Sequence, residues 1–288
     1  MKIIVTGGNG QLGSEINALA SQYPTYEFLF TDHNEIDITN LESIENAVKN
    51  FNANVIINCA AYTAVDKAET EVASADAINN LGAKNLAEIA KKYNCKLVHI
   101  STDFIFDGTN FSPIVEDNIA NPLGVYGATK WQGELSALAA NSATFIVRTS
   151  WVYSSFGNNF VKTILRLCKE KPQLNIIFDQ IGTPTYARDL AAFILSNLEK
   201  ICTKNISGVF HFSNEGVASW YDFAIAIRDL AGLQTPIFPI ETSQYPTPAK
   251  RPHYSVLNKK KIKETFAITI PYWRDSLQKC VAILQTSN

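Results

Sequence analysis

The stretch VTGGNGQLG, residues 5–13, follows a short β-branched run and precedes a segment with apolar residues at helical spacing. Its glycines Gly7, Gly10 and Gly13 form the pattern G-x-x-G-x-x-G. Glycine at these positions permits a tight turn, close approach of the backbone to a pyrophosphate, and close packing of helix against strand. The helix that follows offers free N–H groups and a positive dipole end to phosphates. The stretch therefore predicts a dinucleotide-binding strand, turn and helix.

Apolar, strand-like segments alternate with amphipathic, helix-like segments beyond this loop. Such alternation indicates right-handed βαβ units, because strands covered on both faces can be apolar throughout. We expect an α/β fold with a doubly wound parallel sheet of the Rossmann type. The expected strands are residues 2–6, 27–31, 54–58, 96–101 and 143–149, and the expected helices are 12–20, 44–51, 78–92 and 129–139.

The chain changes character after residue 150, where segments shorten and prolines accumulate. Residues 1–150 are expected to form the dinucleotide-binding domain. Later sheet units over 175–178, 187–198 and 209–212 are expected to return to it. The remainder, 151–288, is expected to be mainly a smaller, interleaved substrate lobe over 213–270.

Composition excludes several classes of function. The 288 residues are 46% hydrophobic and 18% charged with a net charge of −2, so we expect a folded protein without a nucleic-acid footprint. No apolar run reaches the ~18 residues of a membrane span. The start MKIIVTGG lacks the features of a signal peptide, and five scattered cysteines without a CxxC pair suggest reduced thiols. These features predict a cytoplasmic protein.

Two strand ends offer further cofactor contacts. Asp32 closes the second strand about 20 residues after the glycines, where an acid commonly binds the adenosine ribose, although an ordinary turn acid would look the same. Asp37 and Ile38 follow in a loop on the adenine side. The third strand ends in small residues around Ala60 and Ala61, which suit either a cofactor or tight packing.

Tyr126 and Lys130 form the pattern Y-x-x-x-K at the start of a helix. A spacing of four residues places both side chains on one helical face. A nearby ammonium group favours phenolate, so we expect a lowered phenol pKa and a Tyr126 that transfers protons near neutral pH. Thr102 ends the fourth strand, where its hydroxyl would reach a reacting carbonyl oxygen. The Y-x-x-x-K pattern alone is often a solvated helix face, but the three features in this order are far more specific.

Seven segments together resemble the extended short-chain dehydrogenase/reductases and, within them, the dTDP-4-dehydrorhamnose reductase family. They run from residue 5 to residue 258 and are VTGGNGQLG, INCAAYTAVDKAE, STDFIFDG, NPLGVYGATKWQGE, RTSWVYSSFGNNFV, DQIGTPTYARDLA and RPHYSVLN. The resemblance implies reduction of the C4 keto group of dTDP-4-dehydro-β-L-rhamnose by hydride transfer from NADPH or NADH. The alternatives are a 4,6-dehydratase or 4-epimerase of the same superfamily, and a non-catalytic regulatory subunit of a methionine adenosyltransferase with this fold.

The same resemblance implies roles for individual residues. Tyr126 would donate the proton, with Lys130 and Thr102 completing the catalytic set, while Thr102, Asp103 and Trp151 would contact the sugar. Arg251 would bind the nucleotide end of the substrate, or else be a surface arginine in a loop. Residues expected to line the coenzyme are Gly7, Gly10, Gln11, Leu12, Gly13, Asp32, Asp37, Ile38, Ala60, Ala61, Tyr62, Thr63, Tyr126 and Lys130.

The coenzyme preference follows from Asp32. A carboxylate accepts hydrogen bonds from a free 2′-hydroxyl but repels a 2′-phosphate, and the neighbouring His33 would help only when protonated. We therefore expect both coenzymes to work, with NADH used at least comparably to NADPH.

One departure from the family concerns metal. Some members are metal-bridged dimers that use acidic residues. Glu15 matches one such position, but Arg188 stands where another acid would be expected. We expect a homodimer without a metal site. His99 and Trp220 are expected to be buried core residues.

Overall fold

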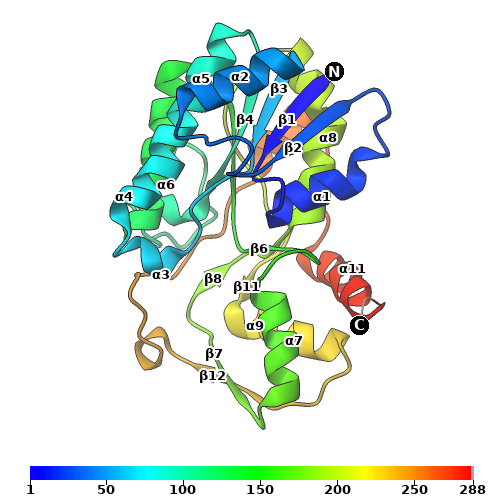
Figure 1. Cartoon of the computed structure of the whole chain (residues 1–288). Helices are drawn as coiled ribbons and strands as arrows, with labels where there is room; N and C mark the ends of the chain where they lie inside the picture. Colours follow the sequence, from blue (N-terminus) through cyan, green and yellow to red (C-terminus); the bar gives the residue numbers. More distant parts are fainter. Residues whose placement is uncertain (287–288) are drawn as a thin grey trace.

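A six-stranded parallel sheet forms the centre of the upper half of the molecule in a computed structural model that describes residues 1–286 (Figure 1). The strands that were expected at 2–6 and 27–31 have these bounds in the structure, and the three other expected strands differ by at most two residues at either end. The doubly wound parallel sheet is thus confirmed. In spatial order the strands are β10 (Gly208–His211), β5 (Phe145–Thr149), β4 (Lys96–Thr102), β3 (Val55–Asn58), β1 (Lys2–Thr6) and β2 (Glu27–Thr31).

The strand order reverses at β1. The chain passes from β1 to β2 on one side, and the next strand, β3, then pairs with the opposite side of β1. The connections that leave the carboxyl ends of β1 and β3 therefore diverge to opposite faces of the sheet. In open α/β sheets the crevice opened by this divergence is where ligands bind.

Helices cover both faces of the main sheet (Figure 1). Strand residues alternate between the faces, so that Ile3 and Val5 pack into one core and Ile4 into the other. None of the helices within residues 1–286 is both long and apolar enough to cross a membrane. One face carries α1 (Gln11–Ala20), α8 (Ala187–Thr203) and α10 (Lys260–Phe266); the other side has α2 (Leu41–Phe51), α3 (Val65–Ala68), α4 (Val72–Asp76), η1 (Ala77–Leu81), α5 (Gly82–Lys92) and α6 (Val125–Ala140).

A smaller lobe with its own apolar core lies below the carboxyl ends of the strands (Figure 1). Its core is built from helix faces and from three short strand pairs instead of one continuous sheet. The helices are α7 (Phe160–Glu170), α9 (Trp220–Leu230) and α11 (Trp273–Thr286). The pairs are β12 (Ile237–Ile240) with β7 (Leu174–Ile177), β11 (Ala218–Ser219) with β8 (Ile181–Gly182), and β6 (Val152–Tyr153) with β9 (Thr185–Tyr186); two short 3₁₀ helices, η2 (Asp103–Ile105) and η3 (Thr242–Gln244), complete the list.

The expected division of the chain needs two corrections. The strand expected over 175–178 forms as β7, but it pairs with β12 in the lower lobe, so its assignment to the main sheet is wrong. Asn175 is exposed, whereas the inner strands of the main sheet are buried on both faces. Helix α10, expected in the lobe, instead packs Ile262 and Phe266 into the core beneath the main sheet. The later units α8 and β10 do return to this sheet.

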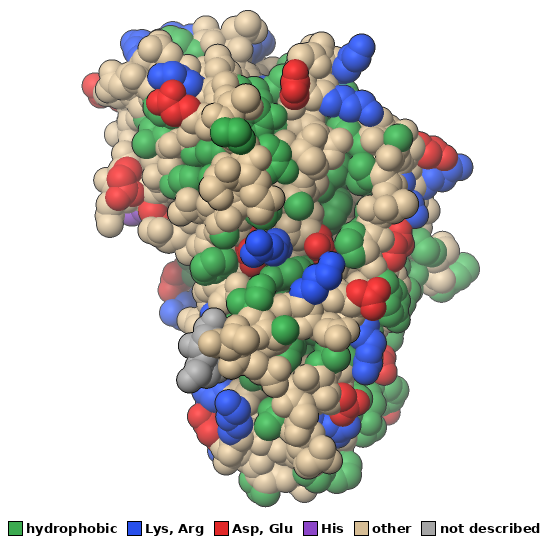
Figure 2. All heavy atoms as spheres, turned by 90° about the vertical axis from the view of Figure 1, so that its right-hand side faces the viewer, with side chains coloured by type: hydrophobic (Ala, Val, Ile, Leu, Met, Phe, Trp, Pro, Cys, Tyr) green, Lys and Arg blue, Asp and Glu red, His purple; other side chains and the backbone are tan. Residues whose placement is uncertain are grey.

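Charge is distributed evenly over the surface that Figure 2 shows. Lys and Arg side chains are interspersed with Asp and Glu there. The face accordingly presents no extended basic patch of the kind that binds a phosphate backbone.

Candidate active site

An open cavity of about 870 Å³ lies along the carboxyl ends of the strands. Its walls run from the glycine loop after β1, past the ends of β3, β4 and β5, to Trp220 of the lower lobe. This is the crevice that the reversal of strand order creates, and its volume is in the range of small-molecule and cofactor sites.

The glycine loop lies at one end of the cavity. Gly7 has a φ of +66°, and a Cβ there would lie 2.7 Å from the Ala60 backbone nitrogen. Gly10 is the N-cap residue of α1, and no side chain caps this helix end. The first-turn N–H groups of α1 thus face the cavity unblocked by a capping side chain, as binding of a pyrophosphate requires. The loop fits a dinucleotide.

The end of β2 supplies the adenosine side of the cavity, where Asp32 and His33 both line the wall. The Asp32 carboxylate accepts a hydrogen bond from the His33 backbone nitrogen at 2.9 Å. Asp37 also lines the wall, but its Oδ1 accepts from the nitrogen and the hydroxyl of Thr39, at 2.9 and 2.7 Å. The Thr39 hydroxyl, followed by its backbone nitrogen, holds the pKa of Asp37 below its usual range. Asp37 thus shapes the adenine-side loop.

Two of the expected coenzyme residues do not line the cavity. Gly13 lies beneath the loop, where a Cβ would come within 2.4 Å of the Gly7 carbonyl oxygen. Tyr62 points elsewhere, because its hydroxyl donates to Glu71 at 2.6 Å and its backbone nitrogen donates to the side chain of Asn79. The other expected coenzyme residues all line the cavity.

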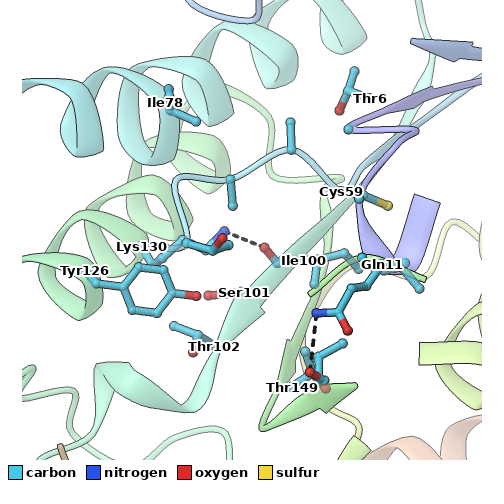
Figure 3. A pocket seen from close by; sticks show the side chains of 18 of the residues that line it. Thr6, Gln11, Cys59, Ile78, Ile100, Ser101, Thr102, Tyr126, Lys130 and Thr149 are labelled. Carbon is cyan, nitrogen blue, oxygen red and sulfur yellow. Dashed lines mark hydrogen bonds between the residues drawn. The ribbon is translucent and has the colours of Figure 1, made fainter. Parts of the chain in front are cut away.

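Tyr126, Lys130 and Thr102 meet at the centre of the cavity (Figure 3). Tyr126 and Lys130 extend from the first two turns of α6 toward the end of β4, where Thr102 lies. Lys130 Nζ donates to the carbonyl oxygen of Ile100 at 2.6 Å. Thr102 Oγ1 donates to Asp103 Oδ1 at 3.1 Å and accepts from the backbone nitrogen of Phe104. The three side chains predicted to transfer the proton therefore lie together in one cavity.

The pKa values of this group differ from the expectation. Burial raises the pKa of Tyr126 to about 12, although a hydrogen bond with Thr102 acts in the opposite direction. The predicted lowering of the phenol pKa is wrong, because desolvation of the phenolate outweighs other influences. Burial also lowers the pKa of Lys130 to about 8, against the charge of Glu134. Tyr126 is thus a neutral phenol at pH 7, which is the form that donates a proton.

Asp103 lies beside this group and is almost completely buried, with 1% of its surface exposed. Burial raises the pKa of its carboxyl group to about 6, even though hydrogen bonds from Ser255, Thr102 and backbone nitrogens act in the opposite direction. At neutral pH the cavity therefore holds a carboxylate at the end of β4 in an environment that weakly favours its neutral form.

The far end of the cavity contains both Trp151 and Arg251. The Arg251 guanidinium makes two hydrogen bonds to Asp66, at 3.1 and 2.8 Å, and one to the hydroxyl of Thr247 at 2.6 Å. Its side chain is 24% exposed. Arg251 is therefore a partly exposed, ion-paired residue of a loop that lines the cavity.

Sequence reasoning missed several lining residues. Trp220 was expected only in the core of the lobe; it does pack against that core but also faces the cavity. Thr149 ends β5 and lines the cavity as well. The rule that applied to Thr102, a polar residue at the carboxyl end of a parallel strand, would have found Thr149. No local signal marks Trp220, because its place depends on how the lobe folds back.

His99 is buried in β4, as expected. Its Nδ1 lies 2.9 Å from the side-chain nitrogen of Asn58, and burial, together with the charge of Lys130, lowers its pKa well below the usual value. Asn58 in turn accepts hydrogen bonds from Thr6 and from the Ala60 nitrogen. His99 thus helps to order the ends of β1 and β3.

Glu15 is completely buried on α1, where its Oε1 accepts from the hydroxyl of Ser154 at 2.6 Å. Arg188 Nη1 lies 3.7 Å from the other carboxyl oxygen. Burial nevertheless raises the pKa of Glu15. Within residues 1–286, no group of three or more His, Cys, Asp or Glu side chains is placed to hold a metal ion.

The chain is similar in sequence to one family of proteins over nearly its whole length. Residues 1–286 match the family model described as RmlD substrate binding domain. A dTDP-4-dehydrorhamnose reductase from Aggregatibacter actinomycetemcomitans is 43% identical over 285 residues, covering 96% of this chain and 97% of the relative.

Two solved structures extend the similarity to three dimensions. One is a dTDP-4-dehydrorhamnose reductase from Clostridium acetobutylicum, 42% identical with a TM-score of 0.94, covering 99% of this chain and 100% of that one. The other is a dTDP-4-dehydrorhamnose reductase from Bacillus anthracis in complex with NADP, 36% identical with a TM-score of 0.92, covering 98% of this chain and 99% of that one.

Proposed function

The chain belongs to the RmlD substrate-binding-domain family, and we propose that it reduces the C4 keto group of dTDP-4-dehydro-β-L-rhamnose to give dTDP-L-rhamnose, with NADPH or NADH as reductant. The observation that carries this proposal is the meeting of Tyr126, Lys130 and Thr102 in the cavity that also contains the glycine loop. One cavity can therefore hold the dinucleotide, the keto sugar that accepts the hydride and the side chain that donates the proton.

The chain's residues supply the proton and the polarisation of the keto group. When bound, the reduced coenzyme supplies the hydride that becomes the new C4–H bond, and is itself oxidised. Tyr126 donates its phenolic proton to the C4 oxygen, which completes the hydroxyl group. The Thr102 hydroxyl hydrogen-bonds the same oxygen and favours the charge that develops on it. The Lys130 ammonium stabilises the phenolate left on Tyr126.

Three further residues form the proposed substrate subsites. Asp103 and Trp151 face the sugar beside Thr102. Arg251 binds the diphosphate, because a guanidinium matches the paired oxygens of a phosphate. This role is supported by the position of Arg251 in the cavity wall.

The adenosine side supports use of both coenzymes. Asp32 offers a carboxylate to the ribose 2′-hydroxyl. The Lys and Arg residues that line the cavity are Lys130 and Arg251. Neither belongs to the segment that follows β2, where a 2′-phosphate would need a cation. NADH is therefore expected to work at least comparably to NADPH at neutral pH. The ratio of the two kcat/KM values tests this, and a hundredfold preference for NADPH would contradict it.

We infer a cytoplasmic enzyme, since all five cysteines are free thiols. A homodimer is the proposed assembly. Arg188, which lies 3.7 Å from the Glu15 carboxylate, supports only the expectation that no metal bridges it. Sedimentation in the presence and absence of EDTA tests the dimer and the absence of a metal bridge, because a metal-bridged dimer would dissociate on chelation.

The function is tested by mixing purified protein with NADPH and dTDP-4-dehydrorhamnose and following absorbance at 340 nm. We expect stoichiometric loss of reduced coenzyme that depends on the sugar nucleotide. A dehydratase or epimerase would consume no net coenzyme, and a regulatory subunit would show no turnover; either result would overturn the proposal.

A further inference from the structure

The indole rings of Trp151 and Trp220 lie face to face at the substrate end of the cavity. Their centroids are 3.6 Å apart and their planes differ by 8°. Trp151 follows β5 of the main sheet, and Trp220 begins α9 of the lobe. Both rings line the main cavity and also a small hollow beside it, which Phe104 and Arg251 share. The stack therefore joins the two halves of the molecule at the sugar end of the site.

Trp151 has a backbone conformation that depends on its surroundings. Its φ is +47°, in the left-handed region that bulky side chains rarely adopt. Gly182 makes room for the ring, since a Cβ there would lie 2.7 Å from the indole. Such strain persists only where neighbouring contacts hold the residue in place, and it is concentrated at functional sites. The stacked ring of Trp220 is one of these contacts.

Trp220 itself is held firmly. It is the first residue of α9 and directly follows the N-cap residue Ser219, which exchanges hydrogen bonds of 3.0 and 2.9 Å with Asp222 in a capping box. The ring of Phe160, from the start of α7, packs against it with centroids 4.7 Å apart. A capped helix and a second aromatic ring thus make Trp220 a rigid support.

We propose that Trp220 is a positioning residue for the sugar subsite, acting by stacking on Trp151 and holding its indole as the apolar wall against which the deoxyhexulose packs. This inference rests on the proposed function. An aromatic face suits the C–H surface of a deoxy sugar, and contacts between aromatic rings contribute beyond the apolar area that they bury. The diphosphate and nucleoside do not need this wall.

The test compares Trp220→Ala with Tyr221→Ala. Tyr221 is the next residue of α9 and packs against the lobe core, but it lines neither cavity. Binding of dTDP-L-rhamnose and of dTDP alone is measured by calorimetry. For Trp220→Ala we expect the Kd of dTDP-L-rhamnose to rise about tenfold, the scale of an aromatic pair, and the Kd of dTDP to stay within twofold. Tyr221→Ala should change neither Kd.

Two more measurements separate positioning from general loss of structure. Near-ultraviolet circular dichroism should show the coupled signal of stacked indoles in the wild type and in Tyr221→Ala, and its loss in Trp220→Ala. Trp220→Phe, which keeps an aromatic face, should recover part of the dTDP-L-rhamnose affinity. Equal weakening of both ligands, or no weakening, would overturn the inference. If the wild type itself fails to reduce dTDP-4-dehydrorhamnose, the proposed function fails instead.

Discussion

Tyr126 shows how one residue takes its chemistry from its surroundings. The Y-x-x-x-K spacing predicted a phenol activated by a nearby ammonium group, whereas burial raises its pKa to about 12. A reductase needs a proton donor, and a phenol that stays protonated at neutral pH meets this need. Residue spacing could predict the partners but not the depth of burial, because burial depends on segments far away in the chain.

Tyr126→Phe removes only the phenolic hydroxyl. We expect coenzyme binding to stay within about twofold and kcat to fall by about 10²–10⁴, the usual contribution of a positioned proton donor. Fluorescence titration with NADPH and steady-state kinetics measure the two quantities. Turnover near that of the wild type would show that another group donates the proton.

Asp103 gives a prediction at the same scale about stability and pH. Its folded-state pKa of about 6 exceeds the unfolded value of about 4, so the stability it contributes is present below about pH 4 and is lost as pH rises through about 6. Asp103→Asn removes this loss. We expect the unfolding free energy of the variant to exceed that of the wild type by about 1–3 kcal/mol at pH 8. At pH 4 this difference should be absent.

Urea denaturation at the two pH values measures the difference. Asp107→Asn is the matched control, because the backbone nitrogen of Thr109 and the Asn121 side chain hold the pKa of Asp107 below its usual range. That variant should gain nothing at pH 8. If Asp103→Asn were less stable than the wild type at pH 8, the Asp103 carboxylate would be favoured by its site and the argument would be wrong.

At the scale of elements, the glycine loop and its strand and helix were predictable from sequence. Periodicity and turn chemistry together placed β1 and α1 almost to the residue. The assignment of β7 to the main sheet was wrong because the sequence of a short apolar strand does not determine which sheet it joins. Its partner β12 lies 63 positions further along the chain, and pairing at that distance is decided by packing of the lobe.

Gly13→Ala tests the packing of α1 against the loop. In a helix interior such a change is favourable by up to about 1 kcal/mol, but here the added Cβ would lie 2.4 Å from the Gly7 carbonyl oxygen and 2.7 Å from Gly8 Cα. We expect a loss of about 1–3 kcal/mol in unfolding free energy and at least tenfold weaker NADPH binding. The neighbouring Ser14→Ala should change neither quantity appreciably. A stabilised Gly13→Ala variant would contradict the packing argument.

At the scale of the whole molecule, an ion pair joins the two halves at the site. Asp66 belongs to α3 beside the main sheet, and Arg251 belongs to the late segment that crosses the lobe. The sequence predicted a substrate lobe but not this contact, since the two residues are 185 positions apart. Arg251 thus has a structural partner as well as a proposed ligand.

Arg251→Ala and Asp66→Ala separate these two roles. Loss of a phosphate ligand should raise the KM for the sugar nucleotide about tenfold or more in Arg251→Ala, with the KM for NADPH unchanged. Asp66→Ala breaks the same ion pair but leaves the guanidinium, so its sugar-nucleotide KM should stay near that of the wild type. Equal increases in both variants would assign Arg251 to interdomain structure alone.

In the proposed reaction, hydride passes from the nicotinamide to C4 of the sugar in this cavity. The most direct measurement incubates the wild-type protein with dTDP-4-dehydrorhamnose and NADPH carrying deuterium at both C4 positions of the nicotinamide, and analyses the product by NMR. We expect dTDP-L-rhamnose with one deuterium at C4 of the rhamnose, one for each NADPH oxidised. A product without deuterium at C4, or no product while NADPH remains reduced, would contradict it.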